Sequence, residues 1–466
     1  MPRPPFVHPP AASLCIVCGL LAAAALSPLC PAEPPAQSSP AAAPSTPFPA
    51  TTAGRIAAAY LAMFNSNSDE AVANFERTYR SSARRNEVGV EERQTRVRAM
   101  RTELESLSVK EIVDSSDDSL SIQLLSGNGQ LVGMRFNLDK KEPGKLDGVE
   151  VMVGGPMIRS EPVSQAEIAH TVDAVCDVLD KNYVDPEVAR KMSAAVRENL
   201  TGGAYSQIAT DHALARRLTD DLRSISKDRH LDVNVLPPED RNGSNHEEPQ
   251  PAPLELAKDN YGFRKVELLP GNVGYIKFDF FAGVDEAHPT VAAAMTFVGH
   301  CHALVFDLRQ NGGGSPEMVR FIISYLFVVP THLNDMVDRD GKTAEEFWTL
   351  KDVPGPRIPA DVPVYVLTSS RTFSGAEEFA YDLKSLKRAT IVGETTGGGG
   401  HAVRPETIGN RFVLNVPFMR ASNPITKTNW EGVGVEPDVK TTAGEALDRA
   451  LKMARENGAR TKPSQK

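Results

Sequence analysis

Apolar side chains change their spacing along this chain, and each change predicts a different kind of element. Between residues 51 and 107 they recur at steps of three and four, which predicts amphipathic helices. From Ser119 to Val153 the step falls to two, and the Gly127–Gly129 segment interrupts this stretch as a hairpin turn would. Helices followed by neighbouring strands predict an α+β domain over residues 51–155.

Residues 163–236 return to helical spacing. Ser164 and Glu167 form the Ser-x-x-Glu pattern of a capping box, which marks a helix start. The helical pattern stops at Asp228-Arg229-His230-Leu231, where a short strand-like run begins. We therefore expect a small helical subdomain here, followed by a Pro-rich acidic linker over residues 237–256.

The next part of the chain, residues 261–443, alternates strands with helices. Ala303–Leu308 and Val362–Leu367 are continuous apolar runs, which is typical of strands buried on both faces of a parallel sheet. Helical segments fit between these runs, so the pattern predicts an α/β domain with a largely parallel core. We expect residues 444–466 to form a C-terminal helix and tail.

The N-terminus has the pattern of a secretory signal. Arg3 is the only Lys, Arg, Asp or Glu among residues 1–32, and an apolar stretch follows from Ala11 to Leu26. We expect residues 1–32 to be a signal peptide and the Pro/Ala/Ser-rich residues 33–50 to be a disordered linker. The mature protein would then be periplasmic or secreted, with an N-terminal membrane anchor as the alternative if the segment stays uncleaved.

Composition narrows the range of partners. The 466 residues carry a net charge of −9, which argues against nucleic acid as the main partner, and 41% are hydrophobic, enough for substantial cores. Three of the five cysteines lie in the expected signal peptide. For Cys176 and Cys301 we expect buried free thiols, while one disulfide stays open as the alternative.

The segment around Ser374 is the strongest candidate for chemistry. The buried strand ends near Leu367, the chain turns through Thr372-Phe373-Ser374, and a helix begins. A serine at this turn is exposed beyond the carboxyl end of the strand and next to the positive end of the helix dipole. The structural alternative is that Ser374 and Glu377 only form a capping box.

Three glycines, Gly312, Gly313 and Gly314, follow the buried strand at Ala303–Leu308. Their freedom of backbone conformation lets several N–H groups point at one place, as an oxyanion hole requires. A tight turn without function is the alternative. A nucleotide-phosphate loop is disfavoured because the Lys-Ser/Thr of the Walker motif is absent.

Several titratable residues are weaker candidates on their own. They are His230 before a strand, Glu431 in a Gly-rich segment, and His401 after Gly397–Gly400. The His300–His302 segment has the look of a metal pair, but it leads directly into a buried strand. We therefore expect no metal site and no cofactor.

Four motifs in order resemble the tail-specific, or C-terminal-processing, serine peptidase superfamily. They are Asp307-Leu308-Arg309-x-Asn311-Gly312-Gly313-Gly314, Thr372-Phe373-Ser374-Gly375-Ala376-Glu377, Val392-Gly393-Glu394-Thr395-Thr396-Gly397-Gly398 and Gly432-Val433-Gly434-Val435-x-Pro437-Asp438. The resemblance implies a ClpP/crotonase-like α/β catalytic domain. Residues 163–236 resemble the N-terminal subdomain of the branch that includes the tricorn core and the interphotoreceptor retinoid-binding protein.

This branch implies a particular set of catalytic residues. The Ser–Lys enzymes of the superfamily carry a lysine near Gly397–Gly400 and an inserted PDZ domain, and this chain has neither. Tricorn-like members use His, Ser and Glu in that order, which corresponds to His230, Ser374 and Glu431. The oxyanion hole would be built from Gly375 with Gly312 or Gly313. One departure is Arg229, where tricorn-like sites have a serine.

Residues 51–155 resemble the SnoaL-like cone fold in their order of elements, which implies an accessory domain. Together the resemblances imply an exported serine peptidase that cuts peptides or protein tails and uses no cofactor. A non-catalytic binder of apolar small molecules and a hydrolase of small esters or amides are the alternatives. The oligomeric state and the cleavage preference stay open.

Overall fold

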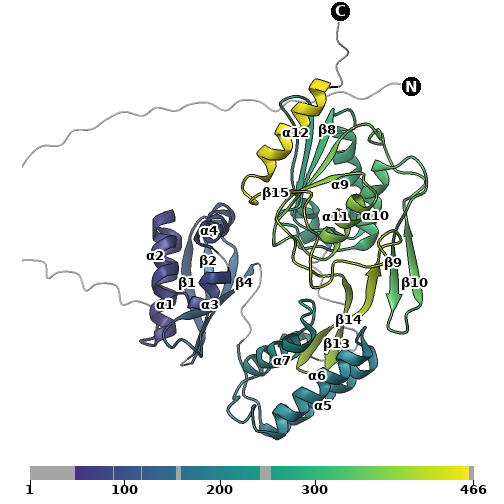
Figure 1. Cartoon of the computed structure of the whole chain (residues 1–466). Helices are drawn as coiled ribbons and strands as arrows, with labels where there is room; N and C mark the ends of the chain where they lie inside the picture. Colours follow the sequence, from purple (N-terminus) through teal and green to yellow (C-terminus); the bar gives the residue numbers. More distant parts are fainter. Residues whose placement is uncertain (1–47, 88, 117, 154–158, 242–252, 461–466) are drawn as a thin grey trace, which may run out of the picture. The chain divides into compact units, whose positions relative to one another are not determined.

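The computed structural model describes residues 48–460, except 88, 117, 154–158 and 242–252 (Figure 1). The expected signal peptide and most of the expected linker thus lie outside the described residues. The chain forms two compact units, one built from most of the residues up to Val149 and one from most of the residues that follow. Each unit is described by itself.

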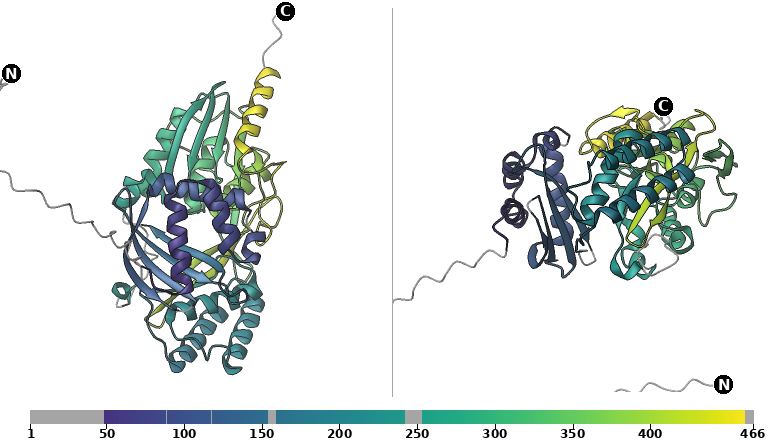
Figure 2. Two further views of the ribbon diagram at one scale, coloured as in Figure 1. Left: turned by 90° about the vertical axis from the view of Figure 1, so that its left-hand side faces the viewer. Right: turned by 90° about the horizontal axis from the view of Figure 1, so that it is seen from below.

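The N-terminal unit has four helices and a four-stranded sheet with the strand order β1-β2-β3-β4. Figure 2 shows the helices of this unit lying across its strands. The elements are α1 (Thr52–Asn65), α2 (Asp69–Tyr79), α3 (Ser82–Glu87), α4 (Val90–Leu104), β1 (Leu107–Ser115), β2 (Ser119–Ser126), β3 (Leu131–Leu138) and β4 (Leu146–Val153). The predicted helices and the hairpin at Gly127–Gly129 are confirmed.

Aromatic side chains hold the helices of this unit to its sheet. The ring of Tyr60 in α1 lies 5.4 Å from Phe75 in α2 and 5.4 Å from Phe136 in β3, measured between ring centroids. All three rings are buried. Edge-to-face packing of this kind adds to the stabilisation that burial of the rings provides. The unit therefore has a core of its own.

The helical subdomain comprises α5 (Gln165–Asn182), α6 (Pro186–Thr201) and α7 (Asp211–Ser226), followed by β5 (Asp232–Val235). The predicted capping box is present, because Ser164 Oγ accepts the Glu167 N–H while the Glu167 carboxylate accepts the Ser164 N–H. The buried faces of the three helices pack on apolar side chains of β5, β13 and β14. This core thus includes strands that come late in the chain.

The larger sheet is mixed, with the strand order β15-β12-β11-β8-β7-β6. All of its pairs are parallel except the one between β6 and β7. The strands are β6 (Phe263–Leu269), β7 (Val273–Phe278), β8 (Ala303–Asp307), β11 (Val364–Thr368), β12 (Thr390–Gly393) and β15 (Val439–Lys440). The predicted parallel α/β core is therefore present.

Helices cover both faces of this sheet (Figure 1). Leu304 and Phe306 of β8 face a core shared with α9 (Val284–Phe297), α10 (Pro316–Ile323) and α11 (Gly375–Ser385). The alternating residues Ala303 and Val305 face α12 (Ala446–Arg460) on the other side. Burial on both faces explains why the sequence of β8 is a continuous apolar run.

A second, antiparallel sheet joins the helical subdomain to the α/β core. Its strand order is β10-β9-β14-β13, and β5 also pairs with β14. The strands are β9 (His332–Asp338), β10 (Thr343–Trp348), β13 (His401–Ile408) and β14 (Phe412–Ser422). The hydrophobic pattern did not predict this sheet, because its exposed faces interrupt the apolar runs and because the pairings of β14 with β5 and β9 join segments far apart in sequence.

Short elements complete the second unit: α8 (Pro253–Lys258) and the 3₁₀ turns η1 (Pro238–Asp240), η2 (Asn260–Gly262) and η3 (Ser324–Leu326). Cys176 and Cys301 are buried free thiols, as expected. Burial raises the pKa of both thiols. Within the described ranges, no helix has the length and apolar character needed to span a bilayer.

Candidate active site

Two loops meet at one edge of the larger sheet. The parallel strands β8 and β11 pair with Leu367 opposite Asp307, so the segments that follow them leave the sheet together. The Phe373 N–H donates to the Asn311 carbonyl at 3.2 Å, which binds the two loops directly to one another. The turn that holds Ser374 and the glycine-rich loop are therefore neighbours.

Ser374 lies at the start of α11 in a strained conformation. Its φ of 52° and ψ of −125° are rare for a residue with a Cβ, and such a conformation costs ~1–3 kcal/mol. Strain of this kind persists where the surroundings enforce it, and it gathers at active sites. The predicted strand-to-helix turn is confirmed. The capping interpretation also has support, because the Ser374 N–H donates to Glu377 Oε2 at 2.9 Å.

Glu377 does more than the capping pattern predicts. Its buried carboxylate accepts hydrogen bonds from the Thr396 hydroxyl at 2.5 Å and from the N–H groups of Gly398 and Gly399 at 2.7 Å each. Burial nevertheless raises the pKa of Glu377. The residue therefore ties the turn of Ser374 to the glycine-rich segment before β13.

The glycine loop lies very close to Ser374. Gly313 has a φ of +106°, and a Cβ added there would lie 2.6 Å from Cβ of Ser374, so only glycine fits. The Gly312 N–H already donates to the Asp279 carbonyl at 3.1 Å, and the Gly313 N–H donates to Asn311 Oδ1 at 2.9 Å. Neither of these predicted donors is therefore free for an oxyanion.

Gly314 and Gly375 are better placed as donors. Both line the same cavity as Ser374, whereas Gly312 and Gly313 do not. Among the described residues, neither N–H group has a hydrogen-bond acceptor. Gly375 is the first residue of α11, where a backbone N–H has no partner within the helix.

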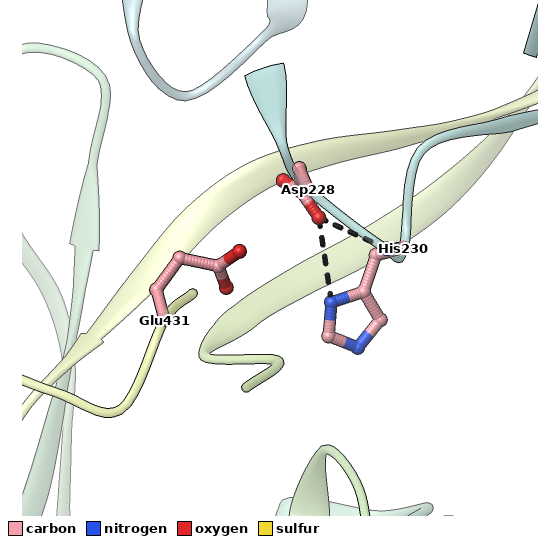
Figure 3. Close-up of side chains that lie close together, drawn as sticks. All are labelled: Asp228, His230 and Glu431. Carbon is pink, nitrogen blue, oxygen red and sulfur yellow. Dashed lines mark hydrogen bonds and ion pairs between the residues drawn. The ribbon is translucent and has the colours of Figure 1, made fainter. Parts of the chain in front are cut away.

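His230 lies against the turn that holds Ser374, just before β5. Its ring centroid is 4.5 Å from that of Phe373, the residue before Ser374. The side chain is 7% exposed, and neither ring nitrogen has a hydrogen-bond partner within the described chain. Nδ1 is 3.7 Å from Asp228 Oδ1 (Figure 3). The ring is thus packed in place with both nitrogens available.

Asp228 is a buried carboxylate with several donors around it. It accepts the His230 N–H at 2.9 Å, His401 Nδ1 at 2.7 Å and the Tyr183 hydroxyl at 3.2 Å. Burial by itself raises the pKa of Asp228, but the hydrogen bonds from His230 and His401 outweigh it and hold this pKa well below its usual range. Asp228 therefore stays ionised beside the histidines.

Glu431 lies in the loop after β14, with its carboxylate turned toward Asp228 and His230 (Figure 3). One ligand atom from each of these three residues lies within 4.8 Å of the others. Glu431 Oε2 accepts the Gly400 N–H at 2.6 Å and is 3.6 Å from His401 Nδ1. Burial raises the pKa of Glu431, although the charge of His401 opposes that rise.

His401 has more contacts in the site than its local sequence indicates. Burial lowers its pKa, but the hydrogen bond to Asp228 and the charge of Glu431 outweigh burial and raise it. His401 also lines the cavity beside Ser374. Its link to Asp228 spans 173 positions of the chain, so no local pattern could have revealed it.

Arg229 has a clear role in holding the site together. Its guanidinium lies over the ring of Phe373 at 5.1 Å and donates to the Gly397 carbonyl at 2.9 Å. It therefore connects the loop of His230 with the turn of Ser374 and the glycine-rich segment. The residue that departs from the tricorn-like pattern thus binds the same loops that the site needs.

Three side chains of the site have donor atoms of the kind that bind metal ions. Asp228, His230 and Glu431 are the one group of the described chain close enough to share an ion. Because Asp228 already accepts three hydrogen bonds, these residues fit a hydrogen-bonded catalytic set.

A cavity of about 750 Å³ opens beside Ser374, within the range of ligand sites. Its lining includes backbone of the glycine loops and several apolar side chains, among them Phe281, Met336 and Trp430. The buried carboxyl of Glu378 also lines it. Ser374 therefore borders a space large enough for an amino-acid side chain.

Comparison with known families agrees with this geometry. Residues 272–441 match Peptidase family S41, and residues 164–265 match the N-terminal domain of this peptidase family in eukaryotic interphotoreceptor retinoid-binding protein. The match to the peptidase family covers the larger sheet from β7 to β15, including Ser374 and Glu431.

Curated relatives are C-terminal processing peptidases. The chain is 30% identical over 189 residues to carboxyl-terminal-processing peptidase 2, chloroplastic, from Arabidopsis thaliana, covering 36% of this chain and 33% of the relative. It is 28% identical over 186 residues to the C-terminal processing peptidase, chloroplastic, from Tetradesmus obliquus, covering 37% of each. The chain thus spans only about a third of the length of these relatives.

Solved structures with a similar arrangement include the photosystem II D1 C-terminal processing protease and the tricorn protease. The first has a TM-score of 0.40 and 19% identity, covering 62% of this chain and 98% of that one. The second has a TM-score of 0.43 and 15% identity, covering 75% of this chain and 42% of that one.

Proposed function

We propose that this chain, which carries a serine-type peptidase domain of family S41, hydrolyses peptide bonds in peptides or protein tails through an acyl-enzyme on Ser374. The observation that carries the proposal is the strained Ser374 at the start of α11, beside a cavity and next to the ring packed on Phe373. A serine held in this way can act as a nucleophile when a base takes its proton.

His230 is the proposed base. It takes the proton of Ser374 Oγ as this oxygen attacks the scissile carbonyl carbon. The C–N bond then breaks, and His230 gives the proton to the leaving amine. Water enters, loses a proton to His230 and hydrolyses the ester, which restores the free serine. Both ring nitrogens of His230 lack hydrogen-bond partners in the described chain, so both are available for these steps.

The oxyanion that forms on the carbonyl needs two aligned donors. We assign them to the N–H groups of Gly375 and Gly314, because both line the cavity and neither has another acceptor in the described chain. The positive end of α11 adds to the stabilisation of negative charge at this place. The predicted pairing of Gly375 with Gly312 or Gly313 is thereby shifted by one or two residues.

Glu431 remains the proposed third member of the catalytic set, now with Asp228 beside it. Asp228 is ionised and lies 3.7 Å from Nδ1 of His230, while Glu431 is in the same cluster. A carboxylate near Nδ1 favours the tautomer that leaves Nε2 free to take a proton, and it stabilises the imidazolium that follows. Asp228 supplies the fixed charge, and Glu431 adds to it when His230 becomes charged.

Active-site labelling tests the proposal directly. A fluorophosphonate probe should modify the protein at Ser374, as determined by mass spectrometry of its peptides, and Ser374→Ala should abolish the adduct while the protein stays folded. Ser370→Ala is the matched control, since Ser370 lies exposed in the same turn and should leave labelling unchanged. Stoichiometric modification of a different serine would contradict the assignment.

The cavity also supports the alternative that the protein binds apolar small molecules without catalysis, because its walls are largely apolar. Failure of the wild-type protein to react with the probe would favour that alternative. We also propose that the catalytic domain has a ClpP/crotonase-like fold and that a SnoaL-like cone domain precedes it in the chain. Residues 1–32 would direct export.

A further inference from the structure

Three polar side chains follow one face of α11. Ser374, Glu378 and Asp382 are spaced four residues apart, so each lies one helical turn beyond the last. Ser374 and Glu378 both line the cavity of about 750 Å³, and Asp382 lies one turn deeper. Glu378 is 4% exposed and Asp382 is 0% exposed. A carboxyl group therefore faces the cavity one turn away from the nucleophile.

No cation of the described chain neutralises this carboxyl. The charged groups that interact with Glu378 are Asp382 on its own helix and Glu317 on α10, and both are acids. Its polar neighbour is Asn334 of β9, whose side-chain nitrogen has no hydrogen-bond partner within the described chain. Asp382 keeps one bond, from the Asn423 amide at 3.0 Å, while its Oδ2 has no partner.

Apart from His401, which is bonded to Asp228, the rest of the described cavity lining contains no basic side chain. Among the described lining residues, the other charged or titratable side chains are Asp259 and His401. Asp259 is already paired with Arg264 at 3.0 Å, and His401 is bonded to Asp228 at 2.7 Å. The Glu378 carboxyl is thus a cavity-lining acid that has no counter-ion within the described chain.

A buried acid without a counter-ion holds its proton, and burial raises the pKa of Glu378 to about 8. Burying such a group inside an apolar cavity destabilises the protein unless a partner completes it. An incoming cation would allow Glu378 to ionise and form a buried ion pair. The apolar walls, with Phe281, Met336 and Val403, suit the methylene stem that carries such a cation in lysine.

We propose that Glu378 determines the specificity of this site, and that the cavity takes a lysine or arginine side chain of the substrate. That side chain belongs to the residue that supplies the scissile carbonyl, because the cavity adjoins both Ser374 and the N–H groups of Gly314 and Gly375. This inference rests on the proposed peptidase function. It names the substrate class by charge complementarity between a lone buried acid and a basic side chain.

Two matched phosphonate probes test the inference. They share one scaffold and differ only in the side chain next to phosphorus, which ends in an ammonium group in one and in a methyl group in the other. Wild-type protein should react with the cationic probe at least ~10-fold faster. Glu378→Gln should lose most of this preference, whereas the control Asp382→Asn, which does not line the cavity, should keep it.

The pH dependence supplies a readout that a purely structural role would not change. Since Glu378 must lose its proton to pair with the cation, the preference for the cationic probe should increase between pH 6.5 and 9, and it should stay flat in Glu378→Gln. Faster reaction of wild-type protein with the methyl-ended probe at every pH would overturn the inference, as would an unchanged preference in Glu378→Gln.

A small fluorophosphonate separates this inference from the proposed function. If it labels Ser374 while neither matched probe reacts, the cavity accepts neither side chain and the specificity proposal fails alone. If the fluorophosphonate also fails to label the wild-type protein, the peptidase proposal fails with it.

Discussion

The backbone of Ser374 has the torsion angles that glycine adopts most easily, φ 52° and ψ −125°. Ser374→Gly should therefore relieve strain of ~1 kcal/mol and raise the melting temperature by ~2–4 °C, while all labelling is lost. Ser374→Ala keeps the Cβ and should lose labelling without any gain in stability. Calorimetry of both variants checks this prediction, and equal melting temperatures for the two would show that the strain is absent.

The two carboxylates near His230 should differ in what they contribute. Asp228→Asn should lower the turnover rate by ~100-fold or more and also reduce stability, because His401 and Tyr183 would lose their ionised partner. Glu431→Gln should lower turnover by a similar factor with little change in stability, since burial already disfavours its charge. Measuring the turnover rate and the denaturation midpoint of each variant tests these two expectations. Wild-type turnover in Glu431→Gln would leave Asp228 as the one acid that orients His230.

The buried acids of α11 should make stability fall as pH rises. An acid whose pKa is higher in the folded chain than in the unfolded chain binds more protons when folded, so raising the pH favours unfolding. For Glu378 this window runs from about 4.3, the unfolded value, to about 8. His401, whose folded pKa is also raised, contributes a loss in the same direction above about 6.5.

Glu378→Gln should therefore show a smaller decline in melting temperature between pH 5 and pH 8.5 than the wild-type protein. The variant keeps the decline in stability with pH that His401 and Asp382 contribute. Parallel melting curves for the two proteins across this range would refute the assignment of a raised pKa to Glu378.

Local sequence was a good guide to the residues that lie in motifs and a poor guide to their partners. Ser374 could be selected because it lies within a family motif, and His230 and Glu431 because they match the family order His, Ser, Glu. Glu377 was interpreted as a cap alone, since its three further donors come from Thr396, Gly398 and Gly399, about twenty positions away. Asp228 precedes His230 by two positions, but its contact with His401 depends on the fold and has no local signal.

At the scale of elements, the strand β14 contacts more of the fold than its sequence indicates, because it pairs with three other strands. It pairs with β5, β9 and β13. Of these strands, β5 begins two residues after His230, and β13 begins at His401. Leu414 on this strand is fully buried in the core of the helical subdomain. The position of His230 thus depends on packing against a strand that lies far along the chain.

Leu414→Ala should lower the free energy of unfolding by ~2–5 kcal/mol and reduce labelling of Ser374 at elevated temperature before global unfolding. The matched control is Val413→Ala, because Val413 faces the other side of the strand and is only partly buried. A similar loss of stability in both variants would mean that the Leu414 core does not support the site specifically.

Elements with strong local signals were predicted well. The capping box at Ser164 and the apolar run at Ala303–Leu308 each define their element within a few residues, because one turn or one strand contains the whole signal. The antiparallel sheet of β9, β10, β13 and β14 was missed for the opposite reason. Its two hairpins, β9–β10 and β13–β14, are joined into one sheet by the pairing of β14 with β9, which is distant in sequence, and propensity carries little information about such pairing.

At the scale of the whole molecule, the N-terminal unit contributes none of the proposed catalytic residues and has its own aromatic core. A shortened protein that starts near Pro156 should remain folded, and Ser374 should still react with the fluorophosphonate. Circular dichroism and labelling together check this prediction. A shortened protein that is stable but unreactive would show that residues 51–155 help to build the site or to deliver substrate.

Breaks in hydrophobic spacing mark the expected division of the chain into segments directly. The helical subdomain was expected as a separate segment over residues 163–236. Its core in fact contains Ile408, Phe412, Leu414 and Val416, which belong to the later segment. Hydrophobic spacing along the chain does not reveal a core that two distant segments share.

That shared core has a consequence for the order of synthesis. While a ribosome is extending the chain, the helices that support His230 emerge first, and Ser374 follows much later. The strands β13 and β14, which complete the core beneath His230, follow Ser374 in turn, and Glu431 comes after both. A chain whose synthesis has not yet reached Glu431 therefore lacks part of the proposed catalytic set and part of the core that supports His230.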